Sequence, residues 1–194
     1  MDRRNFIGTL LASGVLGATL PAARAADDLF LPGANRVLIV GQSDQPYALE
    51  LTAQLGQVFT AAGIPHMQAV AGGTELAQVA HVIALLEKAR GGRVIGVMDD
   101  AAAVIFQELA AARGGACVLS THHRFGAGAV RHCCTSATLE AGIVWSEPIS
   151  AQAGRIAGVY AGAIGGRQRA APTVPATGPA DGGPASLVSF LINT

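Results

Sequence analysis

The segment THHRFGAGAVRHCC, residues 121–134, contains three of the five histidines and two of the three cysteines of the chain. Histidine and cysteine are common zinc ligands, and cysteine also carries thiol–disulfide chemistry. Zinc sites usually space two donors as C-x2-C or H-x3-H, whereas the donors of this segment are directly adjacent. The residue types therefore suggest a metal or redox site, and their spacing does not add support for one.

The geometry of a strand divides these donors between two faces, because adjacent side chains of a strand point in opposite directions. If residues 129–134 form a strand, His132 and Cys134 share one face. At most one of His122 and His123 can join them without a special loop geometry. His132 and Cys134 are therefore a weak alternative for a metal or thiol redox site, and we expect no larger ligand set.

The three cysteines leave several pairings open. Cys117 lies on another expected strand and could form a disulfide with Cys133 or Cys134 if the two strands adjoin. A disulfide between the neighbours Cys133 and Cys134 would close a small strained ring. Cysteines on strands also serve as small apolar core residues. One cysteine stays unpaired in any of these arrangements.

A second group of candidate residues follows the predicted strands. In open α/β sheets, ligands bind beyond the carboxyl ends of the strands, so polar residues there would meet on one rim if the strands are neighbours. The ligand-binding candidates are Ser43 and Asp44 after the first strand, Asp99 and Asp100 after the third, and Thr121, His122, His123 and Arg124 after the fourth.

Some of these residues also suit helix capping. Ser43 or Asp44 fits an N-cap, with Pro46 in the first turn of the helix. Asp100 fits the N-cap of the Ala-rich helix that follows the third strand. Asp99 is then the carboxylate with the greater functional interest. Paired acids can bind a divalent ion or titrate at a raised pKa.

Known nucleotide and hydrolase motifs are missing from the sequence. GQSDQP (41–46) has neither the G-x-G-x-x-G glycines nor a G-K-[ST] ending, and the chain has no G-x-S-x-G elbow. AGGTEL (71–76) has two glycines before an expected helix, whose free N–H groups could hold an anion. The sequence identifies no cofactor and leaves open whether the protein is an enzyme.

Strands and helices alternate along the chain. RVLIVG (36–41), IPHMQAV (64–70), RVIGVM (93–98) and ACVLS (116–120) are predicted strands, and the segments between them show helical periodicity. This order predicts a three-layer α/β domain, Rossmann-like or flavodoxin-like, with a mainly parallel sheet covered by helices on both faces. SLVSFLI (186–192) is the expected C-terminal closing strand. Residues 129–134 and 142–145 are further short strands.

A helix is expected from Pro148 to about Gly165, with Gly154, Gly158 and Gly162 at four-residue spacing along one side. We expect this glycine face to pack tightly on the sheet. The alternative is a contact with a secreted partner subunit or with another copy in a homo-oligomer. A membrane helix is disfavoured because Arg155 interrupts the apolar stretch.

The N-terminus has the arginine pair 3–4 just before Phe6, followed by a mildly apolar run over residues 7–20 and small residues at Ala23 and Ala25. This pattern resembles a twin-arginine (Tat) export signal peptide. The run of about 14 residues is too short to span a bilayer, which takes about 20. We therefore expect a cleavable signal peptide over residues 1–25 and no stable membrane span after cleavage.

The resemblance implies passage through the Tat export machinery and a periplasmic or secreted location. Residues 26–194 form the expected single α/β domain, with a mobile Pro/Gly/Ala-rich loop at about 167–185. Formal net charge is zero and only 13% of residues are charged, which argues against binding to nucleic acid.

The leading hypothesis is an exported small-ligand-binding protein or an accessory protein of a secreted redox system. The first alternative is an enzyme that uses Asp99 or Asp100 with His122 or His123 at the strand-end rim. The second alternative is a metal or thiol redox protein that uses His132 and Cys134.

Overall fold

The computed structural model describes residues 36–126, 128–136, 143–148, 152–165 and 186–194. The expected signal peptide (1–25) and Pro/Gly/Ala-rich loop (167–185) lie outside these residues. In chain order the elements are β1 (Val37–Gln42), α3 (Pro46–Ala61), β2 (His66–Ala71), α4 (Gly73–Leu76), α5 (Val79–Lys88), β3 (Arg93–Asp99), α6 (Asp100–Ala111), β4 (Ala116–Phe125), β5 (Ala129–Ser136), β6 (Ile143–Pro148), α7 (Gln152–Ile164) and β7 (Ser186–Asn193).

The strands form one seven-stranded sheet in the order β2-β1-β3-β7-β4-β5-β6. β1 pairs in parallel with β2 and β3, and the other four pairings are antiparallel. Five strands therefore run in one direction, and β5 and β7 run in the other. This mixed sheet with a C-terminal strand confirms the predicted α/β fold class.

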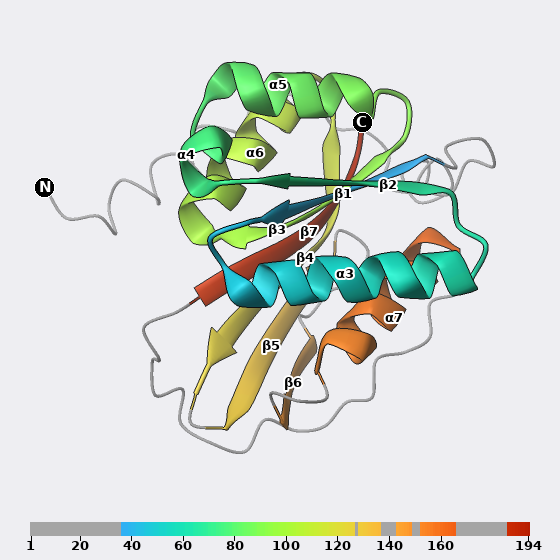
Figure 1. The fold of residues 1–194 in the computed structure, drawn as a ribbon, viewed down its shortest axis with the longest axis vertical. Helices are drawn as coiled ribbons and strands as arrows, with labels where there is room; N and C mark the ends of the chain where they lie inside the picture. Colours follow the sequence, from blue (N-terminus) through green and yellow to red (C-terminus); the bar gives the residue numbers. More distant parts are fainter. Residues whose placement is uncertain (1–35, 127, 137–142, 149–151, 166–185) are drawn as a thin grey trace, which may run out of the picture.

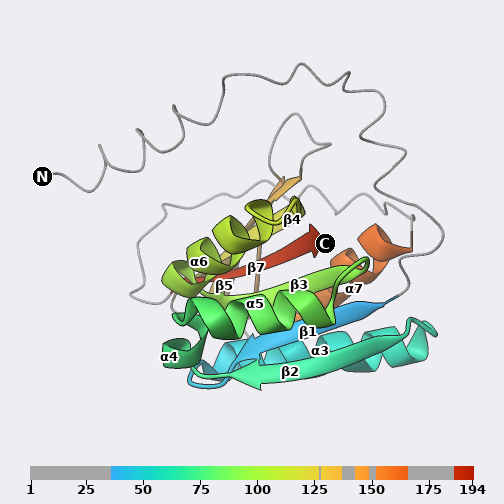
Figure 2. The same ribbon diagram turned by 90° about the horizontal axis from the view of Figure 1, so that it is seen from above.

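The two faces of the sheet carry separate apolar cores. Alternate residues of β1 point to opposite faces, so Ile39 packs with α3 and α7, whereas Val40 packs with α4, α5 and α6. Figures 1 and 2 show these two groups of helices on either side of the sheet. The domain thus has three layers, as the alternation of strands and helices predicts.

The closing strand β7 lies between β3 and β4, and every residue from Leu187 to Ile192 is buried. Gly96 of β3 lies opposite Phe190 in this pairing. A Cβ atom at Gly96 would come within 2.1 Å of the Phe190 ring, so only glycine leaves room for the ring. Because β7 intervenes, β3 and β4 are not neighbours, although their carboxyl ends still lie at the same edge of the sheet.

Two predicted helices differ from the structure. The segment between the second and third strands, whose periodicity predicts one helix with Leu76, Val79, Ile83 and Leu86 on its apolar face, is divided into α4 and α5. This break turns Val79 outward, where it is 53% exposed, and buries Val82 instead. Pro148, expected to start a helix, is the last residue of β6, and α7 begins only at Gln152.

The expectation that the glycine face of α7 packs tightly on the sheet is wrong. Gly154 and Gly158 are exposed, and no described residue lies within 4 Å of a Cβ placed at Gly158. The helix instead turns Ile156, Ala157 and Tyr160 to the core. Among the described residues, no helix is long and apolar enough to cross a membrane.

Candidate functional site

At the carboxyl ends of β1 and β3, Asp99 has the structural role that was expected of Asp100. Asp99 is the N-cap of α6, and its Oδ1 accepts a hydrogen bond from the N–H of Ala102 at 2.8 Å. Its Oδ2 accepts from Nε2 of Gln42 at 2.9 Å, and Gln42 Oε1 accepts from the Asp99 N–H at 2.8 Å. These bonds give Asp99 a capping role, and a functional role for its carboxylate stays a prediction.

Ser43 and Asp44 do not cap α3. The N-cap is Gln45, which makes no side-chain capping bond, whereas Pro46 does occupy the first turn as predicted. Asp44 instead accepts a hydrogen bond from the N–H of Gly73 at 3.2 Å. The Gly72 N–H donates to Glu75 at 2.7 Å. Two carboxylates therefore already occupy the N–H groups of Gly72 and Gly73, the two glycines that were considered for an anion site.

Asp100 is exposed and lies beside His122, with Oδ1 4.0 Å from the His122 Nδ1. Ser186, at the start of β7, donates a short hydrogen bond to Oδ2 of Asp100. The side chains of Asp100 and His122 are both 54% exposed. β4 continues to Phe125, so residues 121–124 lie within the strand, although the sequence predicts that they follow it. Of the predicted rim residues, Asp100 and His122 still lie side by side, and neither Asp99 nor His123 belongs to this pair.

The remaining candidates separate by strand alternation. Thr121 and His123 are fully buried, whereas Arg124 is exposed on the other face of β4. Thr121 lies opposite Cys134, and His123 lies opposite His132. The prediction that at most one histidine of the 122–123 pair joins the face of His132 and Cys134 is confirmed, and that histidine is His123.

His123 and His132 belong to a buried polar network that joins four strands and α7. The Tyr160 hydroxyl lies 2.8 Å from Ser189 Oγ, and Ser189 Oγ lies 2.7 Å from His123 Nε2. The Nδ1 atoms of His123 and His132 are 2.7 Å apart. His132 Nε2 then lies 3.3 Å from Glu147 Oε1, a contact without hydrogen-bond geometry. All five side chains are buried.

The network approaches the surface at its Glu147 end. Trp145 donates from Nε1 to Glu147 Oε1 at 3.2 Å, and Arg155 Nε lies 3.3 Å from Oε2. The Arg155 side chain is 45% exposed, whereas that of Glu147 is only 5% exposed. Burial raises the pKa of Glu147, and both Trp145 and Arg155 oppose this by stabilising the carboxylate.

Burial keeps the two imidazoles neutral. It lowers the pKa of His132 to about 4, with the charge of Arg155 adding to the effect. The pKa of His123 lies well below its usual value because of burial and, second, because of His132. The raised pKa of Tyr160, also caused by burial, keeps its phenol protonated. The network therefore contains neutral hydrogen-bonding groups that end at one buried carboxylate.

No metal site forms among the described residues, which contain no group of three or more His, Cys, Asp or Glu side chains placed to hold an ion. His132 and Cys134 share a face, but Nδ1 of His132 already contacts His123. Burial raises the pKa of the Cys134 thiol, which disfavours the thiolate that a metal or a redox reaction needs. All three cysteines are free, so none of the disulfides considered is present.

The sequence did not single out Tyr160, Ser189, Glu147 or Trp145 for this network. These residues come from α7, β7 and β6, and no spacing along the chain links them to β4 and β5. One signal was available. Ser189 is the polar residue in the middle of the apolar run LVSFLI, and a buried hydroxyl needs a hydrogen-bond partner.

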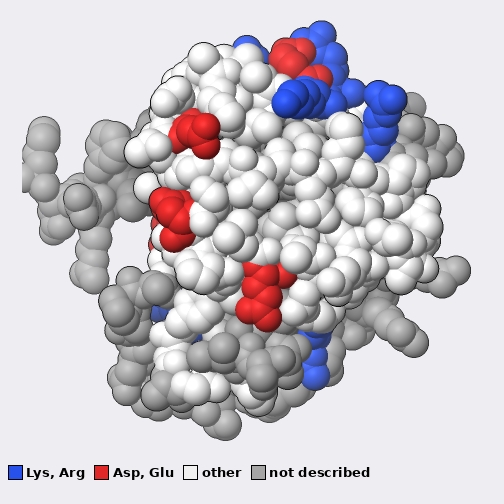
Figure 3. All heavy atoms as spheres, viewed as in Figure 1, with Lys and Arg blue, Asp and Glu red and all other residues white. Residues whose placement is uncertain are grey.

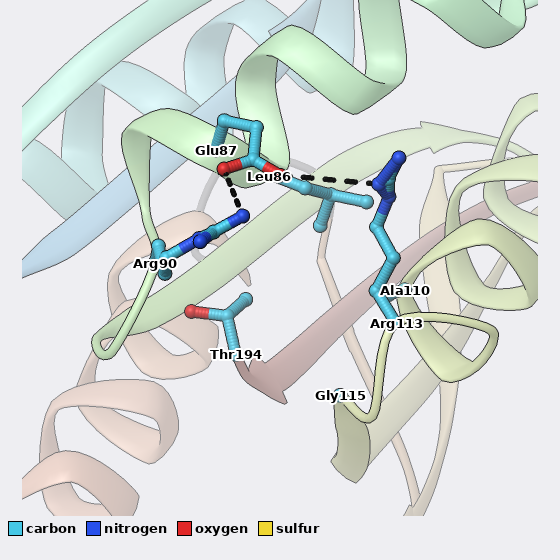
Figure 4. Close-up of a pocket in the computed structure, with 7 residues that line it drawn as sticks. All are labelled: Leu86, Glu87, Arg90, Ala110, Arg113, Gly115 and Thr194. Atoms are coloured by element: carbon cyan, nitrogen blue, oxygen red, sulfur yellow. Dashed lines mark ion pairs between the residues drawn. The ribbon is translucent and has the colours of Figure 1, made fainter.

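A pocket of about 590 Å³ lies at the opposite, amino end of the strands, between the ends of α5 and α6 (Figure 4). The residues that line it are Leu86, Glu87, Arg90, Ala110, Arg113, Gly115 and Thr194. Figure 3 shows Lys and Arg side chains gathered around this end of α5, with acidic side chains toward α4 and over α3. Leu86 and Ala110 are buried and give the pocket an apolar floor.

Two copies of one short motif build this pocket. The tetrapeptide ARGG occurs at residues 89–92, directly after α5, and at residues 112–115, directly after α6. In both copies the first glycine has a positive φ, 70° at Gly91 and 84° at Gly114, a conformation that glycine adopts without strain. The repeated turn places Arg90 and Arg113 on one pocket, and the sequence analysis missed this repeat.

Glu87 lies between the two guanidinium groups (Figure 4). One of its oxygens is 2.5 Å from Nη2 of Arg90, and the other is 3.9 Å from Nη1 of Arg113. The three charges leave one net positive charge at the mouth of the pocket. The chain matches no protein-family model, and no curated protein or solved structure shows significant similarity to it.

Proposed function

We propose that this protein is an exported binding protein for a small organic anion, which Arg90 and Arg113 hold in the pocket between α5 and α6. The observation that carries the proposal is the convergence of two ARGG turns on one pocket. Ligand pockets commonly enclose about 300–1,000 Å³ and combine apolar walls with a few polar groups. This pocket has that size, and it combines two apolar residues, Leu86 and Ala110, with three charged side chains.

Arginine suits this role because its planar guanidinium binds a carboxylate or phosphate through two parallel hydrogen bonds. The arginine side chains are partly exposed, 76% for Arg90 and 38% for Arg113, so a ligand can reach both. Their contacts with Glu87 do not prevent binding, since exposed ion pairs are usually worth about 1 kcal/mol or less. An incoming anion can replace Glu87 as their partner.

The apolar floor narrows the ligand class. Leu86 and Ala110 offer no hydrogen bond, so they favour a ligand with an apolar body beside its anionic group. Benzoate has such a body, and inorganic phosphate presents charge alone. We expect benzoate to bind more tightly than phosphate, although phosphate has the greater charge.

Isothermal titration calorimetry at low ionic strength tests this function. Benzoate should bind to the wild type, and Arg90→Gln and Arg113→Gln should each weaken binding by about tenfold, the usual loss for one charged hydrogen-bond pair. Lys88→Gln is the matched control, because it removes one positive charge from the same end of α5 without lining the pocket. Equal losses in all three variants would reduce the effect to net charge and overturn the proposal.

Export through the Tat pathway belongs to the same proposal and rests on the arginine pair at residues 3–4. Fractionation of cells that express the full chain tests it. The wild type should appear in the periplasm in a shortened form, and Arg3→Lys with Arg4→Lys should keep it in the cytoplasm. Export that persists in the double variant would exclude this route.

A second candidate function is acid–base catalysis at the carboxyl rim by His122 and Asp100. The observation that favours it is the Ser186 hydrogen bond, which holds Asp100 beside an exposed histidine. Hydrolysis of p-nitrophenyl acetate is a simple measurement. A rate that falls in both His122→Asn and Asp100→Asn, but not in Arg124→Gln, would support this candidate, and unchanged rates would exclude it for ester substrates.

A further inference from the structure

β2 is an edge strand that pairs with β1 alone among the described residues, and Figure 2 shows it at the margin of the sheet beside α3. The Val37 N–H donates to Pro65 O, and the Ser43 N–H donates to Ala71 O. In a parallel ladder, alternate residues of a strand bond to the same neighbour. The odd-numbered residues of β2 therefore face β1, and His66, Gln68 and Val70 direct their N–H and C=O groups outward.

This open edge lacks the features that usually block one. Natural proteins protect edge strands with charged side chains, prolines or bulges. β2 has the sequence HMQAVA, without any Lys, Arg, Asp, Glu or Pro, and Met67 and Val70 are 47% and 55% exposed. At the other edge of the sheet, β6 ends at Pro148, which has no N–H to donate. Within the part of the chain that the structure describes, the edge at β2 is thus unpaired and open to another strand.

A groove runs along the same edge, between β2 and the outer side of α3. It encloses about 520 Å³ and is lined by Ala53, Gly56, Gln57, Thr60, Ala61, His66 and Gln68. Because these α3 residues are mostly small, few side-chain atoms project from this side of the helix. Gln68 lies across Gly56, where a Cβ atom would come within 1.8 Å of the Gln68 amide nitrogen. A strand added to β2 would therefore bring its own helix against an α3 surface with little steric obstruction.

We infer that the partner of this edge is a second copy of the chain, with the two β2 strands antiparallel about a two-fold axis at Gln68. In this register Gln68 lies opposite Gln68 of the partner subunit, and His66 lies opposite Val70 of the partner subunit. All three outward residues form hydrogen-bonded pairs, so each strand satisfies the backbone groups of the other.

Self-pairing is favoured over a different partner by the character of the strand. A two-fold interface places the same surface on both sides, so it must be compatible with itself. An uncharged strand meets no like charge in its copy, and two Gln68 amides can each donate and accept one hydrogen bond. The two-fold also places both α3 helices on the same face of the continuous sheet, where their small residues face each other. The arrangement is closed, so it gives a dimer and no fibre.

This inference is tested by introducing charges at Gln68. Sedimentation velocity and light scattering then measure the mass of each purified variant. The wild type should have twice the mass of one protomer. Gln68→Glu, which is nearly isosteric, and Gln68→Lys should each be monomeric because like charges then meet across the axis. An equimolar mixture of the two variants should restore the dimer, since only the two-fold register places residue 68 opposite itself.

Val104→Lys on α6 is the matched control for Val70→Lys, because both residues are exposed valines and only Val70 lies on the edge. Val70→Lys should dissociate the dimer and Val104→Lys should not, with thermal unfolding confirming that both variants fold. A monomeric wild type, or a dimer that survives Gln68→Glu, would overturn the inference. A dimer that is lost in Gly158→Gln instead would place the contact on α7 and would overturn it as well.

Discussion

His123 of β4 and His132 of β5 lie directly opposite each other, and their Nδ1 atoms are 2.7 Å apart in a site that solvent does not reach. One imidazole must donate to the other, so the two rings fix each other's tautomer. His132 also stacks on Trp145, with ring centroids 4.9 Å apart. The pair thus connects the antiparallel half of the sheet through polar contacts as well as apolar ones.

Replacing either histidine should cost more than the loss of one contact. His123→Leu or His132→Leu leaves the other imidazole with a buried nitrogen that has no partner, so we expect a loss of about 2–3 kcal/mol in the free energy of unfolding. The double variant should lose less than the sum of the two, by about 1 kcal/mol. Urea denaturation measures all three values, and strictly additive losses would show that the two rings are not coupled.

Stability should fall as the pH falls below the ordinary histidine range. The pKa of His132 is lowered to about 4 in the folded protein, so between pH 6.5 and 4 the unfolded chain binds a proton that the folded chain does not. This difference costs up to about 3 kcal/mol, and the lowered pKa of His123 adds to it. The raised pKa of Glu147 has the opposite effect on stability. It favours the folded protein at low pH, and this stabilisation is lost as the pH rises.

Urea midpoints from pH 7 to pH 4 measure this dependence. His132→Asn should flatten the curve, because the group that resists protonation is gone. His81→Asn on α5 is the control, since this histidine lies outside the network, and it should keep the slope of the wild type. A wild-type curve that stays flat between pH 6.5 and 4 would contradict the burial of neutral imidazoles.

Arg155 should shift the pKa values of two ionisable neighbours, His132 and Glu147. Its charge lowers the pKa of His132 and that of Glu147, so Arg155→Gln should raise both. NMR titration of the His132 ring and of the Glu147 carboxyl measures the two shifts. Arg124→Gln, which removes an exposed arginine from the outer face of β4, should leave both pKa values unchanged. Equal shifts in the two variants would indicate a long-range effect of net charge.

The two neighbouring aspartates at the start of α6 should differ in their effect on folding. Asp99→Ala removes the N-cap and leaves the Gln42 amide without its partner, for an expected loss of about 2–3 kcal/mol. Asp100→Ala changes an exposed side chain and should cost about 0.5 kcal/mol or less. Thermal unfolding separates the two. A larger loss for Asp100→Ala would reverse the cap assignment.

Local patterns predicted most of the strands. Short apolar runs such as RVLIVG and SLVSFLI must be buried, and a strand inside a sheet buries the side chains on both of its faces. They did not predict that β7 lies between β3 and β4, since an entirely apolar strand specifies burial and not its neighbours. The break after Leu76 was missed for a related reason. Both halves are helical, and only the change in buried face at Val79 and Val82 reveals two helices.

The candidate site shows the same division. Alternation along a strand correctly places one of the two adjacent histidines with His132, because it depends only on backbone geometry. The partners Ser189 and Glu147 depend on strand order, which the sequence pattern does not contain. Arg90 and Arg113 could have been identified from the sequence, because the tetrapeptide ARGG occurs at the ends of two predicted helices.

Glu87 offers the most direct test of the central claim, because it is the carboxylate that an anionic ligand must replace between Arg90 and Arg113. Calorimetric titration of benzoate should show tighter binding to Glu87→Gln than to the wild type, by up to about fivefold, since the competing charge is removed and the side chain keeps its size. Glu108→Gln on α6, outside the pocket lining, should leave the affinity unchanged. Unchanged or weaker binding to Glu87→Gln would contradict an anion site at this pocket.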